Sequence, residues 1–148
     1  MVPNEVEREI AAAAPIERVW AILTESEHFR AWFAFDGAEI DLRPGGKMVM
    51  NWKEHGRFLA VVERVEPPRL FSFRGLPLPE DEPREGNATI VEFTLTPSGD
   101  GTLLRVVESG FRDLQIPEDE RAATVAGNVQ GWIGALSELT AYLERIAA

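Results

Sequence analysis

The C-terminal stretch PEDERAATVAGNVQGWIGALSELTAYLERIAA (117–148) predicts a single long helix. Its apolar residues recur at alternating spacings of four and three, which aligns them along one helical face. These residues are Val125, Val129, Trp132, Leu136, Leu139, Leu143 and Ile146. A helix with one wide apolar face needs an apolar partner, which the rest of the chain has to supply.

The stretch from Ala38 to Ser109 supplies that partner, because its apolar residues follow the period of two that is typical of strands. Glu5–Ala13 fits a further strand. Two short helices follow it, one beginning at Pro15 and one with Ser26 as candidate N-cap. The order of strand, two helices, about six strands and a long helix predicts an α+β domain. In it, a curved antiparallel sheet wraps around the last helix.

Turn residues separate the predicted strands at Arg43–Gly46, His55–Gly56, Pro67–Pro68 and Pro97–Asp100. A four-residue turn at 97–100 would pair Phe93 with Leu104 and Val91 with Val106, and set Glu92 against Arg105. In this register Glu108 points inward, beside Val106. The irregular stretch 75–87 is predicted to be a mobile loop at the rim of the sheet.

The composition excludes several classes of function. A length of 148 residues indicates one domain, 1–148. A net charge of −10 repels phosphate backbones and anionic lipid, so neither nucleic acid nor a membrane is expected as partner. There is no cysteine, and the two histidines are too few for a multi-histidine metal site. The glycine clusters lie in hairpin turns and there is no nicotinamide, flavin or phosphate signature, so no cofactor is predicted.

No apolar run approaches the roughly 20 residues of a membrane span. The start MVPNEVEREI lacks the features of a signal peptide. We therefore expect a cytoplasmic location.

Several segments together resemble the START-like (SRPBCC) superfamily, and within it the branch named after the activator of the heat-shock-protein-90 ATPase. They are AAPIERVWAILTESEHFRAWF (13–33), RPGGKM (43–48), GRFLAVVERVEPPRLFSF (56–73), VVESGF (106–111) and NVQGWIGALSELTAYLER (128–145). This resemblance implies a helix-grip fold with a deep apolar cavity between sheet and last helix. It also implies binding of lipids, polyketides, hormones or other apolar molecules, while a few members catalyse cyclisation or hydrolysis.

Individual residues match positions of the family pattern. Trp20 and Trp32 match aromatic positions in the first two helices, and Gly45-Gly46 matches a strand turn. Gly110-Phe111 matches the signature after the last strand, and Gly131-Trp132 a motif of the last helix. Gly75 stands where the family often has an aromatic residue, which implies more room at that end of the cavity. The eukaryotic activator has an additional N-terminal domain, so the resemblance does not by itself imply a chaperone partner.

The predicted cavity is lined by inward-facing aromatic, methionine and polar residues. The candidate ligand-binding residues are Met48, Met50, Trp52, Phe58, Phe71, Phe73, Val91, Phe93, Val106, Glu108, Phe111, Asn128, Trp132 and Leu136. A well-filled core is the alternative interpretation of the aromatic set. Glu108 is the one weak catalytic candidate. It would either orient a ligand or act as acid or base, or it would only tie strand to helix through Asn128, Ser109 or a backbone N–H.

Three glycines interrupt the predicted last helix, and each costs about 1 kcal/mol relative to alanine. Gly127, Gly131 and Gly134 fall behind the apolar stripe, so they are not predicted to form the pocket. They indicate either close approach of a loop or of a second subunit in a homodimer, or no special role. His28 and His55 are predicted to be solvated surface residues.

Three functions remain open at this stage. The first is a non-catalytic protein that binds a small apolar or aromatic ligand. The second is a cyclase- or hydrolase-type enzyme that uses Glu108. The third is a protein-interaction module, such as one for a chaperone, in which the acidic surface matters and the cavity does not.

Overall fold

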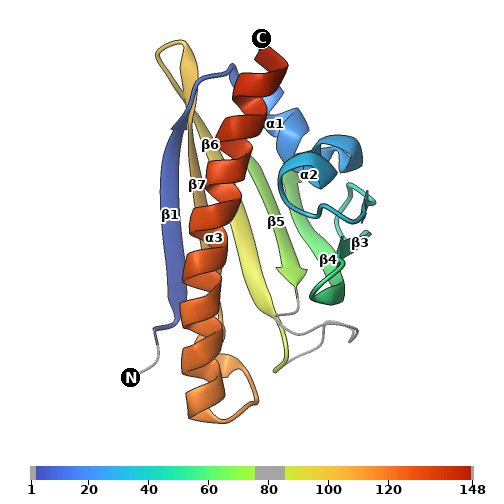
Figure 1. Ribbon diagram of the computed structural model, residues 1–148, viewed down its shortest axis with the longest axis vertical. Coiled ribbons are helices and arrows are strands. Elements are labelled where there is room, and N and C mark those ends of the chain that lie inside the picture. The colour runs from blue at the N-terminus through green and yellow to red at the C-terminus, as the bar shows by residue number, and fades with distance from the viewer. Residues whose placement is uncertain (1–2, 76–85, 148) are drawn as a thin grey trace.

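The computed structural model describes residues 3–75 and 86–147, which form one antiparallel sheet, two short helices and a long C-terminal helix (Figure 1). The strands are β1 (Glu5–Ala12), β2 (Ala38–Ile40), β3 (Lys47–Trp52), β4 (Gly56–Glu66), β5 (Leu70–Gly75), β6 (Thr89–Ser98) and β7 (Gly101–Ser109). The helices are α1 (Ile16–Thr24), α2 (Ser26–Trp32) and α3 (Glu118–Ala147), with a 3₁₀ turn η1 (Phe111–Asp113) before α3. The predicted loop at 75–87 lies mostly outside the described residues.

The sheet has the strand order β1-β7-β6-β5-β4-β3-β2, and all neighbouring strands are antiparallel. Strands β2 to β7 form the predicted meander. Strand β1 lies at the edge of the sheet opposite β2. It pairs with β7 along its whole length, from Glu5 opposite Ser109 to Ala12 opposite Thr102. The first and last strands therefore lie side by side, and the predicted helix-grip architecture is confirmed.

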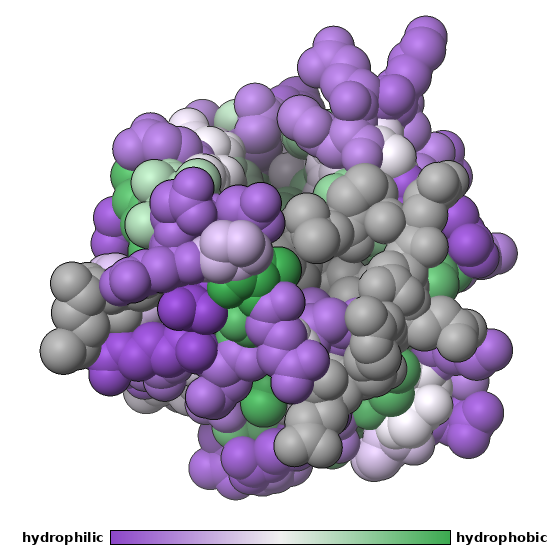
Figure 2. Space-filling model, turned by 90° about the horizontal axis from the view of Figure 1, so that it is seen from below, coloured by the Kyte–Doolittle hydropathy of each residue, from purple (hydrophilic) through white to green (hydrophobic). Residues whose placement is uncertain are grey.

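Helix α3 crosses one face of the sheet, as Figure 1 shows, and its predicted apolar stripe faces the core. Trp132, Leu136, Leu139 and Leu143 are buried in the same cluster as the inward residues of the strands. Helices α1 and α2 pack on the same face, because Trp20 of α1 contacts the inward ring of Phe71, and Phe29 and Trp32 of α2 belong to the same buried cluster. Among the residues coloured by hydropathy in Figure 2, most of those seen from below are hydrophilic, and hydrophobic residues lie in small patches between them.

The register predicted for the β6–β7 hairpin is wrong by two residues. Phe93 lies opposite Val106 and Val91 opposite Glu108, because the strands continue to Ser98 and Gly101. Only Gly99 and Asp100 remain in the turn, where Gly99 has a φ of 60°. Two-residue turns match the twist of paired strands better than longer loops do. A shift of two residues preserves the side-chain parity, so Glu108 still points inward as predicted.

Two local expectations about α2 are also wrong. Ser26 is the first helical residue and not the N-cap, which is Glu25; the Ser26 hydroxyl instead accepts a hydrogen bond from the Ile40 backbone N–H at 3.0 Å. His28 is not a freely solvated side chain, since its Nδ1 lies 2.6 Å from the Tyr142 hydroxyl. Both contacts connect α2 to elements that are distant in the sequence, which a local pattern does not reveal.

Truncation of Leu139 tests the packing of α3. The Leu139→Ala variant should lower the free energy of unfolding by about 2–5 kcal/mol, because a fully buried side chain is replaced by a cavity. Ile133→Ala on the exposed side of the same helix should change it by less than about 0.5 kcal/mol. Urea unfolding followed by tryptophan fluorescence measures both values, and equal effects would contradict the buried face assigned to α3.

Candidate functional site

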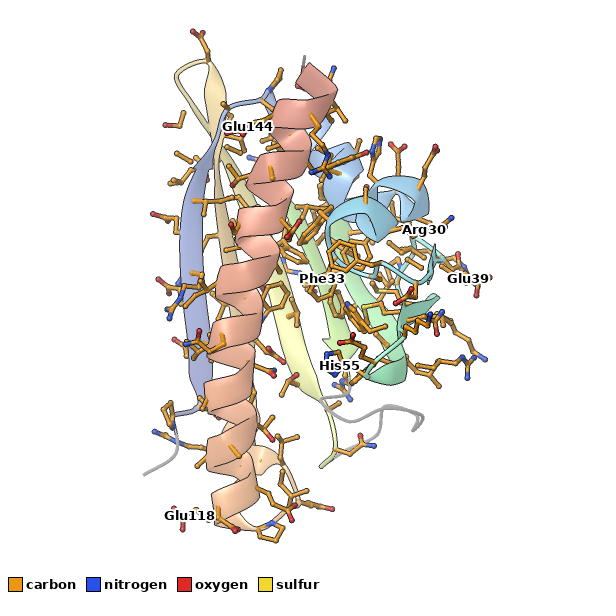
Figure 3. The ribbon with its side chains drawn as sticks, in the orientation of Figure 1. Arg30, Phe33, Glu39, His55, Glu118 and Glu144 are labelled. Carbon is orange, nitrogen blue, oxygen red and sulfur yellow. The ribbon has the colours of Figure 1, made fainter. Side chains whose placement is uncertain are left out.

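A pocket of about 650 Å³ lies between α3, the end of α2 and the strands β3 to β7. It is open to solvent on one side, and most of its wall is apolar. Figure 3 shows Phe33 between α2 and α3 and His55 at the turn between β3 and β4, both on the pocket side of α3. This is the region where the sheet extends past the flank of the helix.

The structure places eight of the predicted ligand-binding residues on the wall of this pocket. They are Met50, Trp52, Phe58, Phe73, Val91, Glu108, Asn128 and Trp132. Six others are not on the pocket wall and lie in the core, at most 3% exposed: Met48, Phe71, Phe93, Val106, Phe111 and Leu136. Inward orientation along a strand was therefore a necessary condition for a place on the wall, and it was not a sufficient one.

Sequence reasoning missed several residues of the wall, most of which come from α2, the loop after it and the flank of α3. They are Trp32, Phe33, Phe35, His55, Thr89, Gly127, Gln130, Gly131, Gly134, Ala135 and Glu138. Gly75, which was expected at one end of the cavity, also lines the pocket. Thr89 was recognisable, because it shares the inward parity of Val91 on β6. Phe35 was harder to find, since it follows α2 outside any periodic element and is 50% exposed.

The prediction that the glycines of α3 do not form the pocket is wrong. Gly127, Gly131 and Gly134 all line it, and a Cβ atom added at any of them would meet no neighbouring heavy atom within 4 Å. At 100° per residue they lie about 110–170° from the middle of the apolar stripe, which places them behind it, as the sequence indicated. The sheet is wide enough to reach around to that flank, so a position behind the stripe still faces the pocket.

A continuous series of aromatic rings connects the sheet to α3 along this pocket. Trp52 lies 5.3 Å from Phe58 and 5.0 Å from Phe33, with near-perpendicular rings in both pairs. Phe33 in turn stacks on Trp132, with centroids 5.4 Å apart and ring planes within 5°. These edge-to-face and stacked contacts fix the rings relative to one another, so the apolar wall is largely preformed.

Glu108 is the polar centre of the pocket and is only 4% exposed. Its Oε1 accepts hydrogen bonds from Asn128 Nδ2 at 2.8 Å and from Trp132 Nε1 at 2.9 Å. Its Oε2 accepts one from the Thr89 hydroxyl at 2.6 Å. The expected bond to Asn128 is therefore present, and Thr89 and Trp132 are partners that the sequence did not reveal. The carboxylate ties β7 to β6 and α3 while facing the pocket.

Within residues 3–75 and 86–147, no group of three or more His, Asp or Glu side chains has a geometry that could hold a metal ion. In the same part of the chain, no helix is long and apolar enough to cross a membrane. The chemistry of the site is thus that of an apolar pocket with one buried, hydrogen-bonded carboxylate.

A curved antiparallel sheet that grips a long C-terminal helix, with a pocket between them, defines the helix-grip class of START-like proteins. Residues 13–144 match the family of activator of Hsp90 ATPase homolog 1-like proteins, and the chain belongs to this family. Comparison with curated proteins gives no match.

Solved structures share the fold over almost the whole chain. Protein MLL2253 from Mesorhizobium loti is 27% identical, with a TM-score of 0.79 over 96% of this chain and 98% of its own. CalU16 from Micromonospora echinospora is 24% identical, with a TM-score of 0.70 over 94% and 75% of the two chains. The Aha1 dimer from Colwellia psychrerythraea, solved in solution, is 17% identical, with a TM-score of 0.77 over 96% and 97%.

Removal of the Glu108 carboxylate should destabilise the protein. The Glu108→Ala variant should lower the free energy of unfolding by about 1–3 kcal/mol, because buried donors on β6 and α3 lose their acceptor. Glu138→Ala, on the exposed rim of the same pocket, should change it by less than about 0.5 kcal/mol. Chemical unfolding measures both, and an unchanged stability of Glu108→Ala would refute the tie between β7 and α3.

Proposed function

We propose that this protein binds a small apolar or aromatic molecule in the pocket between its sheet and α3. The volume of about 650 Å³ lies within the range of roughly 300–1,000 Å³ that is usual for ligand sites. The wall combines rigid rings with Met50, whose flexible side chain adapts to different shapes. The candidate ligand-binding residues are those on the pocket wall.

The glycine wall of α3 is the observation that carries this proposal. Glycine in a helix costs about 1 kcal/mol relative to alanine, and α3 has it at three positions of one flank. Gly127, Gly131 and Gly134 all line the pocket, and a Cβ atom added at any of them would meet no other heavy atom of the protein within 4 Å. The cost to helix stability is explained if the empty space itself is required, which is the case for a ligand site.

The two alternative functions have less support. An enzyme of the cyclase or hydrolase type would use Glu108 as acid or base, whereas three hydrogen bonds hold this carboxylate as an acceptor, which favours positioning of a ligand. A protein-interaction module, including one for a chaperone, would not require the pocket to stay open. A homodimer remains a prediction, and a dimer is the state in which the Colwellia psychrerythraea relative was solved.

Native mass spectrometry of the protein purified from its own host tests the proposal directly. A stoichiometric apolar molecule that organic extraction releases is the expected result. A protein that is empty, and that also gains no thermal stability from a panel of neutral aromatic compounds, would remove the proposal in favour of an interaction module.

A larger side chain at one of these glycines should weaken binding without loss of stability. Gly131→Leu should weaken binding of the neutral fluorescent probe N-phenyl-1-naphthylamine by about tenfold or more, equivalent to about 1.4 kcal/mol. Its melting temperature should be equal or higher, because leucine favours a helix by roughly 0.8 kcal/mol over glycine. Fluorescence titration and thermal unfolding measure the two effects.

The matched control is Ala126→Leu, which adds the same side chain to an exposed position of α3 that does not line the pocket. We expect probe affinity within a factor of about two of the unmodified protein, as for other surface substitutions. If Gly131→Leu bound the probe as tightly as this control does, the pocket would not be the binding site.

A further inference from the structure

We infer that the pocket selects ligands whose polar head group donates hydrogen bonds, prefers a protonated amine there, and excludes a carboxylate. This inference rests on the proposed function and names the class of ligand that the same pocket takes. It follows from the way in which the polar groups of the pocket are already engaged within the protein, and from the sign of the charges around it.

The buried polar end of the pocket has acceptors to spare, and of its donors only the second N–H of Asn128 is outside the bonds described above. Trp132 Nε1, one N–H of Asn128 and the Thr89 hydroxyl all donate to Glu108. An ionised carboxylate offers about four acceptor positions, so one remains on Oε2, which accepts from Thr89 alone among the bonds described above. The Thr89 oxygen and the Asn128 carbonyl oxygen are further acceptors at the same place. The head group of a ligand at this end of the pocket therefore pairs with these acceptors by donating hydrogen bonds.

The indole N–H groups of the pocket are committed as well. Trp52 Nε1 donates to the Phe33 carbonyl oxygen at 2.8 Å, and Trp32 Nε1 donates to the Ile22 carbonyl oxygen at 3.0 Å. Both rings therefore present their apolar surfaces to the pocket while their polar atoms bond within the protein. An acceptor-only head group, such as a carboxylate, would lose its hydration on entry and find no indole donor in exchange.

The charges around the pocket also favour a cationic head group over an anionic one. Among the described residues that line it, Glu108 and Glu138 are acidic, His55 carries an imidazole, and none is lysine or arginine. Arg30, in the last turn of α2, is exposed and points away from α3 (Figure 3). A negative ligand would approach Glu108 without a guanidinium or ammonium partner from these walls, and the repulsion is strong in a site of low dielectric constant.

A cationic head group gains further from the ring series. Trp52, Phe33 and Trp132 form a continuous aromatic wall that ends at the Glu108 carboxylate, because Trp132 contributes both the stacked ring and the N–H bond to Glu108. Aromatic faces attract ammonium groups through their quadrupole, and the attraction is larger where water is excluded. The net charge of −10 adds a long-range attraction for cations.

A series of naphthalene compounds that differ only in the head group tests the inference. The probes are 2-naphthylmethylamine, 2-naphthalenemethanol, 2-methylnaphthalene and 2-naphthoic acid, measured by isothermal titration calorimetry near neutral pH. We expect the amine to bind most tightly and the acid most weakly, with a ratio of about tenfold or more between them, as for a hydrogen bond to a charged group. The alcohol should bind more tightly than the hydrocarbon.

The Glu108→Gln variant locates the preference. It has nearly the same shape as the native residue and no charge, so the ratio between amine and acid should fall to about threefold or less, while binding of 2-methylnaphthalene changes little. Glu144→Gln, at an exposed position of α3 that does not line the pocket, is the matched control, because it removes the same charge from a solvated position, and it should retain most of the native ratio.

The outcomes separate this inference from the proposed function. Binding of 2-methylnaphthalene together with equal or tighter binding of the acid than of the amine would overturn the inference and leave the proposed function in place. Binding of none of the four compounds would remove both. The wild-type series decides this even if Glu108→Gln does not fold, and an unchanged ratio in a folded Glu108→Gln would reject Glu108 as the selecting group.

Discussion

The difference in width between the sheet and the helix that it grips determines the rest of this structure. Seven strands about 4.8 Å apart make a sheet roughly 30 Å wide, whereas a helix with its side chains is about 10–12 Å across. One helix therefore covers only part of the inner face. The remaining part has to be covered by α1, α2 and side chains or be left open, and the pocket is the area that remains uncovered.

Glu108 connects the fold to that open area. A carboxylate removed from water costs several kcal/mol unless it is hydrogen-bonded, so its position on β7 obliges β6 and α3 to present donors. Thr89 comes from β6, and Asn128 and Trp132 lie on adjacent turns of α3. The two bonds from Asn128 and Trp132 fix the rotation and height of α3 above the sheet more specifically than apolar contact does, because hydrogen bonds are directional. The hydrogen bonds to Glu108 also engage most of the donors at this end of the pocket. The carboxylate that positions the helix therefore also determines the polarity of the pocket.

The sequence predicted those features that depend on periodicity and missed those that depend on curvature. The apolar stripe of α3 and the strand parities followed directly from spacing, and parity survived even where the β6–β7 register was wrong by two residues. The pairing of β1 with β7 and the contact between His28 and Tyr142 join distant segments, and no local pattern contains them. The roles of Gly127, Gly131 and Gly134 were missed because a helix was assumed to have one buried face. In a curved sheet, a helix has both a buried face and a flank that overlooks the pocket.

Residues that determine the fold and residues that line the pocket are therefore largely different sets on α3. Leu136, Leu139 and Leu143 belong to the stripe, while Gly131 and Gly134 belong to the flank, where a new side chain meets open space. Substitution on the flank changes the volume and polarity of the pocket without removing core contacts. Strands β3 and β4 have the same property at their ends, since Met48 is in the core and Met50, Trp52 and Phe58 reach the pocket. The fold persists at 17–27% identity among the structures compared, and such a division would allow the space beside the helix to change while the fold is kept.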